Sequence, residues 1–301
     1  MTFELALRDA GLLPRAKDIT ADGRIHRCPT EAKPRSDAGW FVLHADGHGV
    51  FGDWSTGSSE PTGYWKDEHA QHVDRAELDR RMAEQRRAQR DEQLAAMRRA
   101  RELWARCRPL NRLHPYISAK GLSPLGCAGL REHDGLLVVP VWRGEWMVSL
   151  QTIAPDGTKR FAYGAPVRAG SYIIDRPRAA LTVICEGLAT GLALYQSIRH
   201  ARVVVAFNAG NLLPVVELLK PTGSVVIAAD NDHQTKERRG FNPGIEKAEN
   251  AAELIGCGVA YPEGIEGSDW ADWLRELGGN AAKKMERIIL SKAKYVLGEA
   301  R

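Results

Sequence analysis

Acidic side chains stand directly after two strongly apolar runs of this 301-residue chain. Glu186-Gly187 follows the run LTVIC, and Asp230-Asn231-Asp232 follows SVVIAA, with 44 positions from Glu186 to Asp230. Three carboxylates brought together repel one another unless a cation lies among them, and carboxylate oxygens suit a hard divalent ion such as magnesium. We therefore expect a metal-dependent site to which Asp230 and Asp232, two positions apart at a strand end, contribute from one face.

The elements that must position these acids are predicted by the apolar pattern of residues 181–232. Three runs rich in Val and Ile alternate with helix-period segments, which is typical of a parallel sheet buried on both faces. In open α/β sheets the working groups lie just beyond the carboxyl ends of the strands, which is where the acids fall. The alternative is that Glu186 caps a helix and the two aspartates make a turn, but neither role explains why two strands of one unit end in acids.

A strand ending in Glu-Gly, followed by a second strand and then by a strand ending in Asp-x-Asp, resembles the Toprim domain. This domain is shared by bacterial-type primases, type IA and II topoisomerases, and families of nucleases and recombination proteins. The resemblance implies that Asp230 and Asp232 hold Mg²⁺ or Mn²⁺, and that Glu186 acts as a general acid or base or as a further ligand. Taken together with the primase-like segments considered below, the resemblance covers residues 110–275 well and residues 15–60 loosely.

Composition sets the outer limits of the interpretation. With 44% hydrophobic residues the chain is ordinary for a globular protein, and no apolar run approaches the roughly 20 residues of a membrane span. The five cysteines are dispersed without a CxxC pair, and the N-terminus lacks a signal-peptide core, so we expect a cytoplasmic protein without a disulfide framework. A net charge of +4 is compatible with nucleic acid but does not identify it.

The pattern predicts an α/β fold with additional parts, in five segments. These are a small β-rich module at 1–62, a charged linker helix at 63–108, an antiparallel β subdomain at 109–178, the Toprim domain at 179–278 and a C-terminal helix at 279–301.

The first segment has short strands between Asp22-Gly23 and Asp46-Gly47 turns, behind one short helix. Its aromatic residues either pack in a core or, beside arginines, form a surface for single-stranded nucleic acid. Zinc is not expected, because the four candidate ligands lack the paired spacing of a ribbon or finger; they are His26, Cys28, His44 and His48.

The second segment is rich in charged residues, Ala and Gln, and has no Gly or Pro between residues 66 and 107, which predicts one long helix. Its thin apolar seam favours a solvated spacer, with a DNA-phosphate contact face as the alternative.

The third segment alternates apolar and polar residues between turns, after a helix expected to end at Gly121. The words YISAKGL, PV, SLQTI, DGTKRF and RAGSY resemble the subdomain that precedes Toprim in primases of satellite phages and plasmids. That resemblance implies that Lys159, Arg160 and Arg168 line the groove facing the metals, where cations neutralise nucleotide or template phosphates. Lys120 is a weaker candidate for the same role, and surface solubility is the alternative for each of these residues.

Beyond Asp232, a loop carries three further candidates for contacts to a triphosphate or a strand backbone, namely Lys236, Arg238 and Arg239. A helix at 245–255 and a strand at 259–261 follow. The stretch GSDWADWL partly matches a Gly-x-Asp-Phe-Asn-Asp-Leu-like stretch of related primases, which makes Asp269 an additional metal ligand by resemblance. Residues 280–301 are expected to form a basic amphipathic helix.

The reaction that these features favour is metal-dependent primer synthesis on single-stranded DNA from nucleoside triphosphates, with a separate replicative helicase or single-strand-binding protein as a partner. No GxxxxGK[ST] loop is present to support helicase activity. Two alternatives stay open, a Toprim nuclease and a non-catalytic single-strand-binding or recombination-mediator protein. A topoisomerase is not expected, because the chain is too short for a strand-passage arch.

Overall fold

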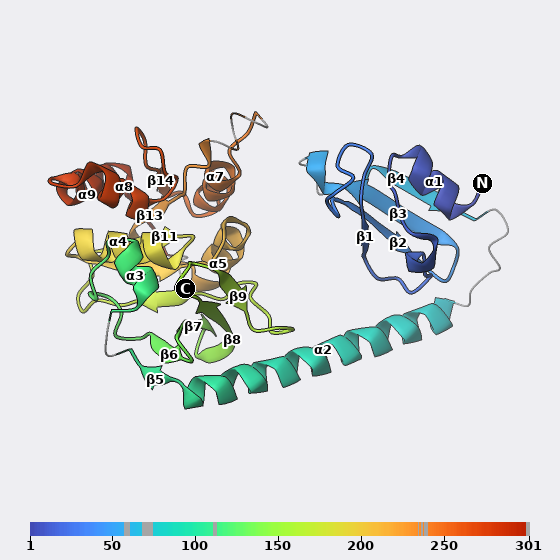
Figure 1. Ribbon diagram of the computed structural model, residues 1–301, viewed down its shortest axis with the longest axis horizontal. Helices are drawn as coiled ribbons and strands as arrows, with labels where there is room; N and C mark the ends of the chain where they lie inside the picture. Colours follow the sequence, from blue (N-terminus) through green and yellow to red (C-terminus); the bar gives the residue numbers. More distant parts are fainter. Residues whose placement is uncertain are drawn as a thin grey trace. The chain divides into compact units, whose positions relative to one another are not determined.

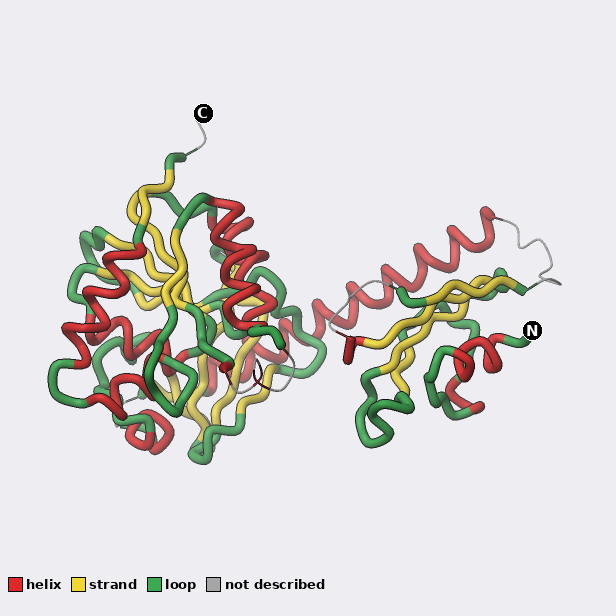
Figure 2. The backbone as a smooth tube through the Cα atoms, turned by 90° about the horizontal axis from the view of Figure 1, so that it is seen from above, coloured by secondary structure: helices red, strands yellow, loops and turns green. Residues whose placement is uncertain are grey.

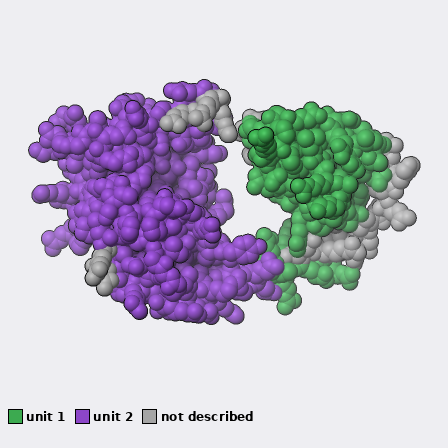
Figure 3. Space-filling view, viewed as in Figure 1, with its two compact units in different colours: residues 1–90 green, residues 91–301 purple. Residues whose placement is uncertain are grey.

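The computed structural model describes residues 1–301 except 57–60, 68–74, 111–112, 234, 236, 238–239 and 299–301. The chain divides into two compact units, residues 1–90 and residues 91–301 (Figure 3). The division into five segments that the sequence suggests is finer than this and stays a prediction. In the described part, no helix is both long and apolar enough to cross a bilayer.

The first unit is a four-stranded antiparallel sheet in the order β1-β2-β3-β4 with one short helix packed on it (Figure 1). Phe3 and Leu7 of the helix bury against Phe41 and Phe51 of the sheet. Its elements are α1 (Phe3–Asp9), β1 (His26–Cys28), β2 (Gly39–Leu43), β3 (His48–Asp53) and β4 (Gly63–Lys66). A positive φ at Gly47 (77°) confirms the predicted Asp46-Gly47 turn, which joins β2 to β3, whereas Asp22-Gly23, with a φ of 68° at Gly23, is a bend before β1 and not a turn between two strands.

Of the four zinc candidates in this unit, Cys28 is buried in the apolar core beside Leu12 and Phe41. His26 is hydrogen-bonded through Nε2 to Asp22 (2.9 Å) and Thr20 (3.2 Å). Of the aromatic residues, Phe41 and Phe51 lie in the core, which is one of the two expected roles, whereas Trp54 is 38% exposed and stacks on Trp40; contact with single-stranded nucleic acid stays a prediction.

The long helix is present, but its bounds and its role differ from the expectation. Helix α2 runs over Arg75–Arg106, and Lys66 is the last residue of β4 rather than the start of the helix. In the second unit its C-terminal half is packed rather than solvated. Ala96 and Ala100 are buried, and Ala100 belongs to an apolar cluster with Val138 and Leu150. The small alanine side chains allow the helix and the sheet to approach closely. This packing is missed when only the few large apolar residues of the helix are counted.

An antiparallel sheet in the order β5-β6-β7-β8-β9 follows this helix, as predicted. Its elements are β5 (Arg108–Pro109), α3 (Pro115–Ala119), β6 (Arg131–His133), β7 (Leu136–Arg143), β8 (Trp146–Ile153) and β9 (Lys159–Phe161). Hairpin turns at Gly144 (φ 58°) and Gly157 (φ 89°) join β7 to β8 and β8 to β9, and Gly121 (φ 67°) ends the helical segment at α3.

The third sheet is mostly parallel, in the order β10-β12-β11-β13-β14, with β15 also paired to β13. Figure 2 shows its strands between layers of helix. Its strands are β10 (Tyr172–Ile174), β11 (Leu181–Cys185), β12 (Ala201–Val205), β13 (Gly223–Ala228), β14 (Gly258–Ala260) and β15 (Lys294–Val296). Its helices are α4 (Leu188–Ser197), α5 (Leu212–Leu219), α7 (Pro243–Ile255), α8 (Trp270–Leu277) and α9 (Ala281–Lys292).

Alternate residues of these strands enter two separate cores, which explains why the runs are apolar throughout. Val183 and Val203 face the core that contains α4, α8 and α9, whereas Ile184 and Val204 face the core that contains α5 and α7. The mixed α/β fold expected from the sequence is therefore confirmed.

Two expectations at the margins of this sheet are wrong. The sequence pattern assigns Tyr172–Ile174 to the antiparallel subdomain, but as β10 this segment pairs antiparallel with β12. The pattern also predicts one helix at the C-terminal end, but α9 ends at Lys292 and Lys294–Val296 forms β15. Segments of three residues are too short to show the alternation of apolar and polar residues that marks a strand. Their conformation is therefore decided by the strands with which they pair.

One buried amide fastens the segment before β10 to the parallel sheet. The Asn211 side chain accepts a hydrogen bond from the N–H of Ala169 (2.7 Å). It also donates to the carbonyl oxygens of Gly170 (2.8 Å) and Ala206 (2.8 Å). This single side chain thereby holds the loop that carries Arg168 at the carboxyl end of β12.

Candidate active site

Glu186 and Asp230 meet because they follow neighbouring parallel strands. In the β11–β13 ladder Cys185 lies opposite Ala228, so Glu186 and Asp230 emerge at the same edge of the sheet. The backbone N–H of Asp230 points to Oε1 of Glu186 at 3.5 Å. The predicted convergence of acids from two strand ends is therefore present in the fold.

Burial and mutual repulsion make both carboxyls hard to ionise. Burial raises the pKa of Glu186 to about 7, and the charge of Asp232 adds to the rise, against hydrogen bonds from the backbone N–H groups of Asp230 and Ala209. The pKa of Asp230 is raised well above its ordinary value, first by burial and then by the charges of Glu186 and Asp269. A cation beside these two carboxyls would offset the free-energy cost of ionising them.

Two residues that the sequence analysis did not single out support Asp230. Thr190, on the first turn of α4 and 1% exposed, donates from Oγ1 to Asp230 Oδ1 at 3.1 Å. Gly244, at the start of α7, lies so close that a Cβ would be 2.6 Å from the Asp230 carbonyl oxygen and 3.3 Å from Glu186 Oε1. Neither belongs to a motif, because each is placed by tertiary packing.

The residue between the two aspartates is the anchor of this strand end. The Asn231 side chain donates to the carbonyl oxygen of Pro262 (2.7 Å) and accepts from the Asn242 amide (2.9 Å), while its backbone N–H donates to Ser268 (2.7 Å). Asp232 lines a small cavity of about 160 Å³ together with residues 233, 235 and 266–268. The two aspartates are thus positioned by the residue they flank.

Lys120 lies against two acids at the start of α8, Asp269 at its N-cap and Asp272 in its first turn. Its Nζ is 3.1 Å from Asp269 Oδ2 and 3.0 Å from Asp272 Oδ1. Burial by itself would lower the pKa of Lys120, but these two carboxylates outweigh it and hold the pKa above its usual range. Asp269 also caps α8, since its Oδ1 accepts from the N–H of Asp272 at 2.7 Å. Both oxygens of this predicted metal ligand therefore have partners within the protein, and Asp272 is an acid of this region that the motif comparison did not single out.

The other predicted cations lie at different places around this edge. Lys159, at the start of β9, brings Nζ to 4.0 Å from where a Cβ would stand on Gly187, and 5.9 Å from the centre of the Tyr116 ring. Arg160 follows it and is exposed, and Arg168 is exposed on the loop held by Asn211. The remaining three candidates, Lys236, Arg238 and Arg239, lie outside the described residues.

Comparison with protein families identifies this part of the chain. Residues 181–280 match the family model of the Toprim domain. This part of the chain is a Toprim domain. The site described above lies at the carboxyl ends of that domain's strands, with Lys120 and Lys159 reaching it from the preceding subdomain.

Comparison with curated proteins extends the likeness over most of the chain. It is 31% identical over 283 residues to a DNA primase TraC of Escherichia coli, covering 86% of the chain and 19% of that protein. A second DNA primase TraC of Escherichia coli is 31% identical over 279 residues, covering 86% of the chain and 26% of that protein. The chain therefore spans about a fifth to a quarter of the length of the curated relatives it matches.

Solved structures give more distant likenesses. The catalytic domain of a DnaG primase bound to single-stranded DNA has a TM-score of 0.44 at 13% identity, covering 69% of this chain and 80% of that one. The primase fragment of the bacteriophage T7 primase-helicase has a TM-score of 0.40 at 14% identity, covering 56% of this chain and 72% of that one. Likenesses of this size are too distant to decide the function of the Toprim domain or of the subdomain before it.

Toprim domains bind divalent metal ions in general, and the donor chemistry of this site fits such an ion. The side chains at this site are carboxylates, the ligands that Mg²⁺ prefers. The pKa values of Glu186 and Asp230 are raised, so a nearby cation would stabilise their ionised forms. Within the part of the chain that the structure describes, however, no three His, Cys, Asp or Glu side chains already form a group able to hold an ion.

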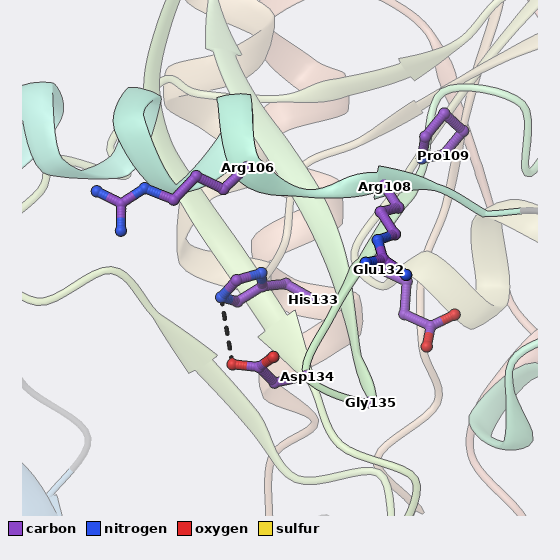
Figure 4. A pocket seen from close by; sticks show the side chains of 7 residues that line it. All are labelled: Arg106, Arg108, Pro109, Glu132, His133, Asp134 and Gly135. Carbon is purple, nitrogen blue, oxygen red and sulfur yellow. Dashed lines mark ion pairs between the residues drawn. The ribbon is translucent and has the colours of Figure 1, made fainter.

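A larger cavity, of about 540 Å³, lies elsewhere in the second unit, between the end of α2 and the turn after β6 (Figure 4). It is lined by Arg106, Arg108, Pro109, Glu132, His133, Asp134 and Gly135. Its charges are mixed, and His133 Nε2 is paired with Asp134 Oδ2 at 3.3 Å. None of the site residues of the Toprim domain lines it, so it is separate from the acidic cluster.

Proposed function

We propose that this chain is the catalytic part of a DNA primase, which joins nucleoside triphosphates into short primers on a single-stranded DNA template. The likeness to two DNA primases over 86% of the chain supports this, because it includes the subdomain before the Toprim domain as well as the domain itself. The observation that carries the proposal is the approach of Lys159, from the antiparallel sheet, to the Glu186-Gly187 turn.

This arrangement suits nucleotidyl transfer, which depends mainly on positioning and charge neutralisation. The 3′-hydroxyl oxygen of the growing primer bonds to the α-phosphorus of the incoming nucleotide, and the bond to pyrophosphate breaks. Glu186, with a pKa near 7, takes the hydroxyl proton. Lys159, Arg160 and Arg168 offer positive charge to the phosphates of nucleotide or template.

Asp230, Asp232 and Asp269 would hold the divalent ions, with Glu186 as a further ligand. Bound Mg²⁺ or Mn²⁺ supplies charge neutralisation at the attacking and leaving oxygens. Thr190 donates a hydrogen bond to one Asp230 oxygen and so fixes the orientation of the carboxylate. The other oxygen is therefore already oriented before an ion binds. Lys120 pairs with one oxygen of Asp269, so it would serve as a counter-ion for the metal-free site, and Asp269 would need that oxygen free in order to hold an ion. A separate helicase or single-strand-binding protein would supply the open template.

A primer-synthesis assay on mixed single-stranded templates, with labelled ribo- or deoxynucleotides and Mg²⁺ or Mn²⁺, tests the proposal. We expect the unmodified protein to make short products, and Glu186→Gln and Asp230→Ala to reduce them by at least about 100-fold. Glu253→Gln, a change of an exposed acid on α7, serves as the matched control and should leave synthesis unchanged. Full synthesis by either site variant would refute the mechanism.

The same reaction without nucleotides separates the proposal from hydrolysis. Cleavage of the DNA by the unmodified protein and Mg²⁺, with no synthesis when nucleotides are added, would show a Toprim nuclease instead. Binding of DNA that survives Asp230→Ala, with neither reaction detected, would show a non-catalytic binding protein.

A further inference from the structure

An exposed group of tryptophan and arginine side chains surrounds the tip of the β7–β8 hairpin in the second unit. Trp146 is 68% exposed and lies opposite Arg143 across the hairpin, whereas Trp142, 37% exposed, lies opposite Met147 and so belongs to the other face. The core at this hairpin is supplied by Met147 and Val148, so the Trp146 ring is not needed there. Trp146 together with Arg101, Arg143 and Arg168 is called the Trp–Arg surface below.

The arginines of this surface are held beside the ring by specific contacts. The Arg101 guanidinium, from α2, lies 5.7 Å from the centre of the Trp146 ring and donates from Nε to the Met147 carbonyl oxygen at 2.9 Å. Arg143, at the tip, donates to the backbone carbonyl oxygen of Arg168. The hairpin, the helix and the loop before β10 thus present one combined surface.

This surface continues to the proposed active site through the backbone. Trp142 and Ser171 exchange two hydrogen bonds of 2.8 Å, and the next residue, Tyr172, lies opposite Val205 at the end of β12. Val205 in turn lies opposite Cys185, the residue before Glu186. Three backbone pairings of roughly 4.8 Å each lie between Trp142 and Glu186, from the hairpin to Ser171, from β10 to β12 and from β12 to β11, so the surface begins about 14 Å from the acidic cluster.

The charge of this part of the chain selects the kind of ligand. Residues 91–178 contain 14 Lys and Arg against 8 Asp and Glu, a net charge of +6, whereas the whole chain carries +4. An exposed aromatic ring among arginines, on a positively charged part of the protein, is how proteins bind single-stranded nucleic acid without reading its sequence. A protein partner with an acidic surface would use the arginines but leave the flat Trp146 ring without a matching group.

We propose that the Trp–Arg surface holds single-stranded DNA next to the active site, with a base stacked on Trp146 and phosphates at Arg101, Arg143 and Arg168. The inference rests on the proposed primase function, because it names the path of the template for that same site. It goes beyond that function by assigning the contact to the hairpin tip, to which no motif points.

The test is binding of fluorescein-labelled oligo(dT) to the full chain, in EDTA and without nucleotides, so that no catalysis is involved. Trp146→Ala should weaken binding by about 5- to 100-fold, the effect of losing one stacked base, and Trp146→Phe should recover most of it. Tyr295→Ala, which removes a 76% exposed ring on β15, is the matched control and should bind like the unmodified protein.

Two further measurements complete the experiment. The tryptophan fluorescence quenched by oligo(dT) should fall in Trp146→Ala, and Arg101→Ala should reduce the slope of log affinity against log salt by about 0.7. Equal affinity of Trp146→Ala and the control, or equal competition by duplex DNA, would overturn the inference. Because this assay needs no primer synthesis, its failure would leave the proposed reaction to be judged by the Glu186 and Asp230 variants alone.

Discussion

Replacing Glu186 by glutamine should stabilise the metal-free protein while it abolishes synthesis. The buried carboxyl has an ordinary pKa of 4.5 and a folded-state pKa of about 7, so the folded protein binds a proton more tightly than the unfolded chain does. Stability therefore falls as pH rises from about 4.5 to about 7, and the loss is complete above the folded pKa. With about 1.4 kcal/mol for each pKa unit, the loss reaches about 3 kcal/mol at pH 8 and about 1 kcal/mol at pH 5. The uncharged amide of the glutamine side chain would escape this loss and still accept the backbone hydrogen bonds.

Thermal unfolding of the second unit in EDTA measures this difference. For a domain of this size, about 3 kcal/mol corresponds to a melting temperature about 6–12 °C higher for Glu186→Gln at pH 8, with a smaller gain at pH 5. Glu253→Gln, on the exposed side of α7, should change neither value. Added Mg²⁺ should raise the melting temperature of the unmodified protein more than that of Glu186→Gln. An unchanged or lower melting temperature for Glu186→Gln at pH 8 would refute the view that burial, together with the charge of Asp232, disfavours the ionised form of Glu186 in the folded state.

Three further predictions concern the residues that hold the acids in place. Gly244→Ala should lower the free energy of unfolding by about 1–3 kcal/mol, since its Cβ would lie 2.6 Å from the carbonyl oxygen of Asp230. Gly187→Ala is the control, because its backbone φ is −107° and the nearest atom to its Cβ would be 4.0 Å away, so it should melt near the unmodified protein. Equal melting temperatures for the two variants would contradict this packing. Thr190→Val should slow primer synthesis about 10-fold while the free energy of unfolding falls by less than about 1.5 kcal/mol, because only one hydrogen bond to Asp230 is lost. Thr190→Ser keeps the hydroxyl and should restore the rate of synthesis. A normal rate for the valine variant would show that the hydroxyl is dispensable. Lys120→Ala should destabilise the metal-free protein by about 1–3 kcal/mol, because the mostly buried Asp269 loses this counter-ion and Asp272 keeps Arg275 as its charged partner. Adding Asp272→Asn should recover part of this loss in urea titration, and a double variant no more stable than the single one would argue against the ion pair.

Strong local patterns carry the part of the fold that can be read from the sequence. The parallel strands are apolar on both faces, so Leu181–Cys185 and Gly223–Ala228 stand out, and the acids directly after them locate the site. The Asp46-Gly47 pair in the first unit likewise specifies a turn by itself, because Gly accepts the positive φ that this turn requires.

What the sequence does not show depends on contacts between distant segments. Lys294–Val296 is three residues long and becomes a strand only because Gly223–Val225 offers it a free edge. Thr190 and Gly244 look ordinary in their helices, and only the fold brings them against Asp230. The burial of Ala96 could not be read either, since a charged helix hides a narrow alanine stripe.

The Asn211 amide, which binds the loop before β10 to the end of β12, has a consequence for how the site responds to its surroundings. Its oxygen and its NH₂ group are all engaged with backbone atoms of Ala169, Gly170 and Ala206, so neutral hydrogen bonds hold this loop on one side, while the Arg143 guanidinium holds the carbonyl oxygen of Arg168 on the other. Salt screens charges but not the neutral bonds, so the link to the end of β12 should persist at a salt concentration that weakens the attraction of Arg168 for a phosphate. Aspartate has the same shape but no N–H to donate, so a single deamidation would keep the hydrogen bond from Ala169 and lose those to Gly170 and Ala206.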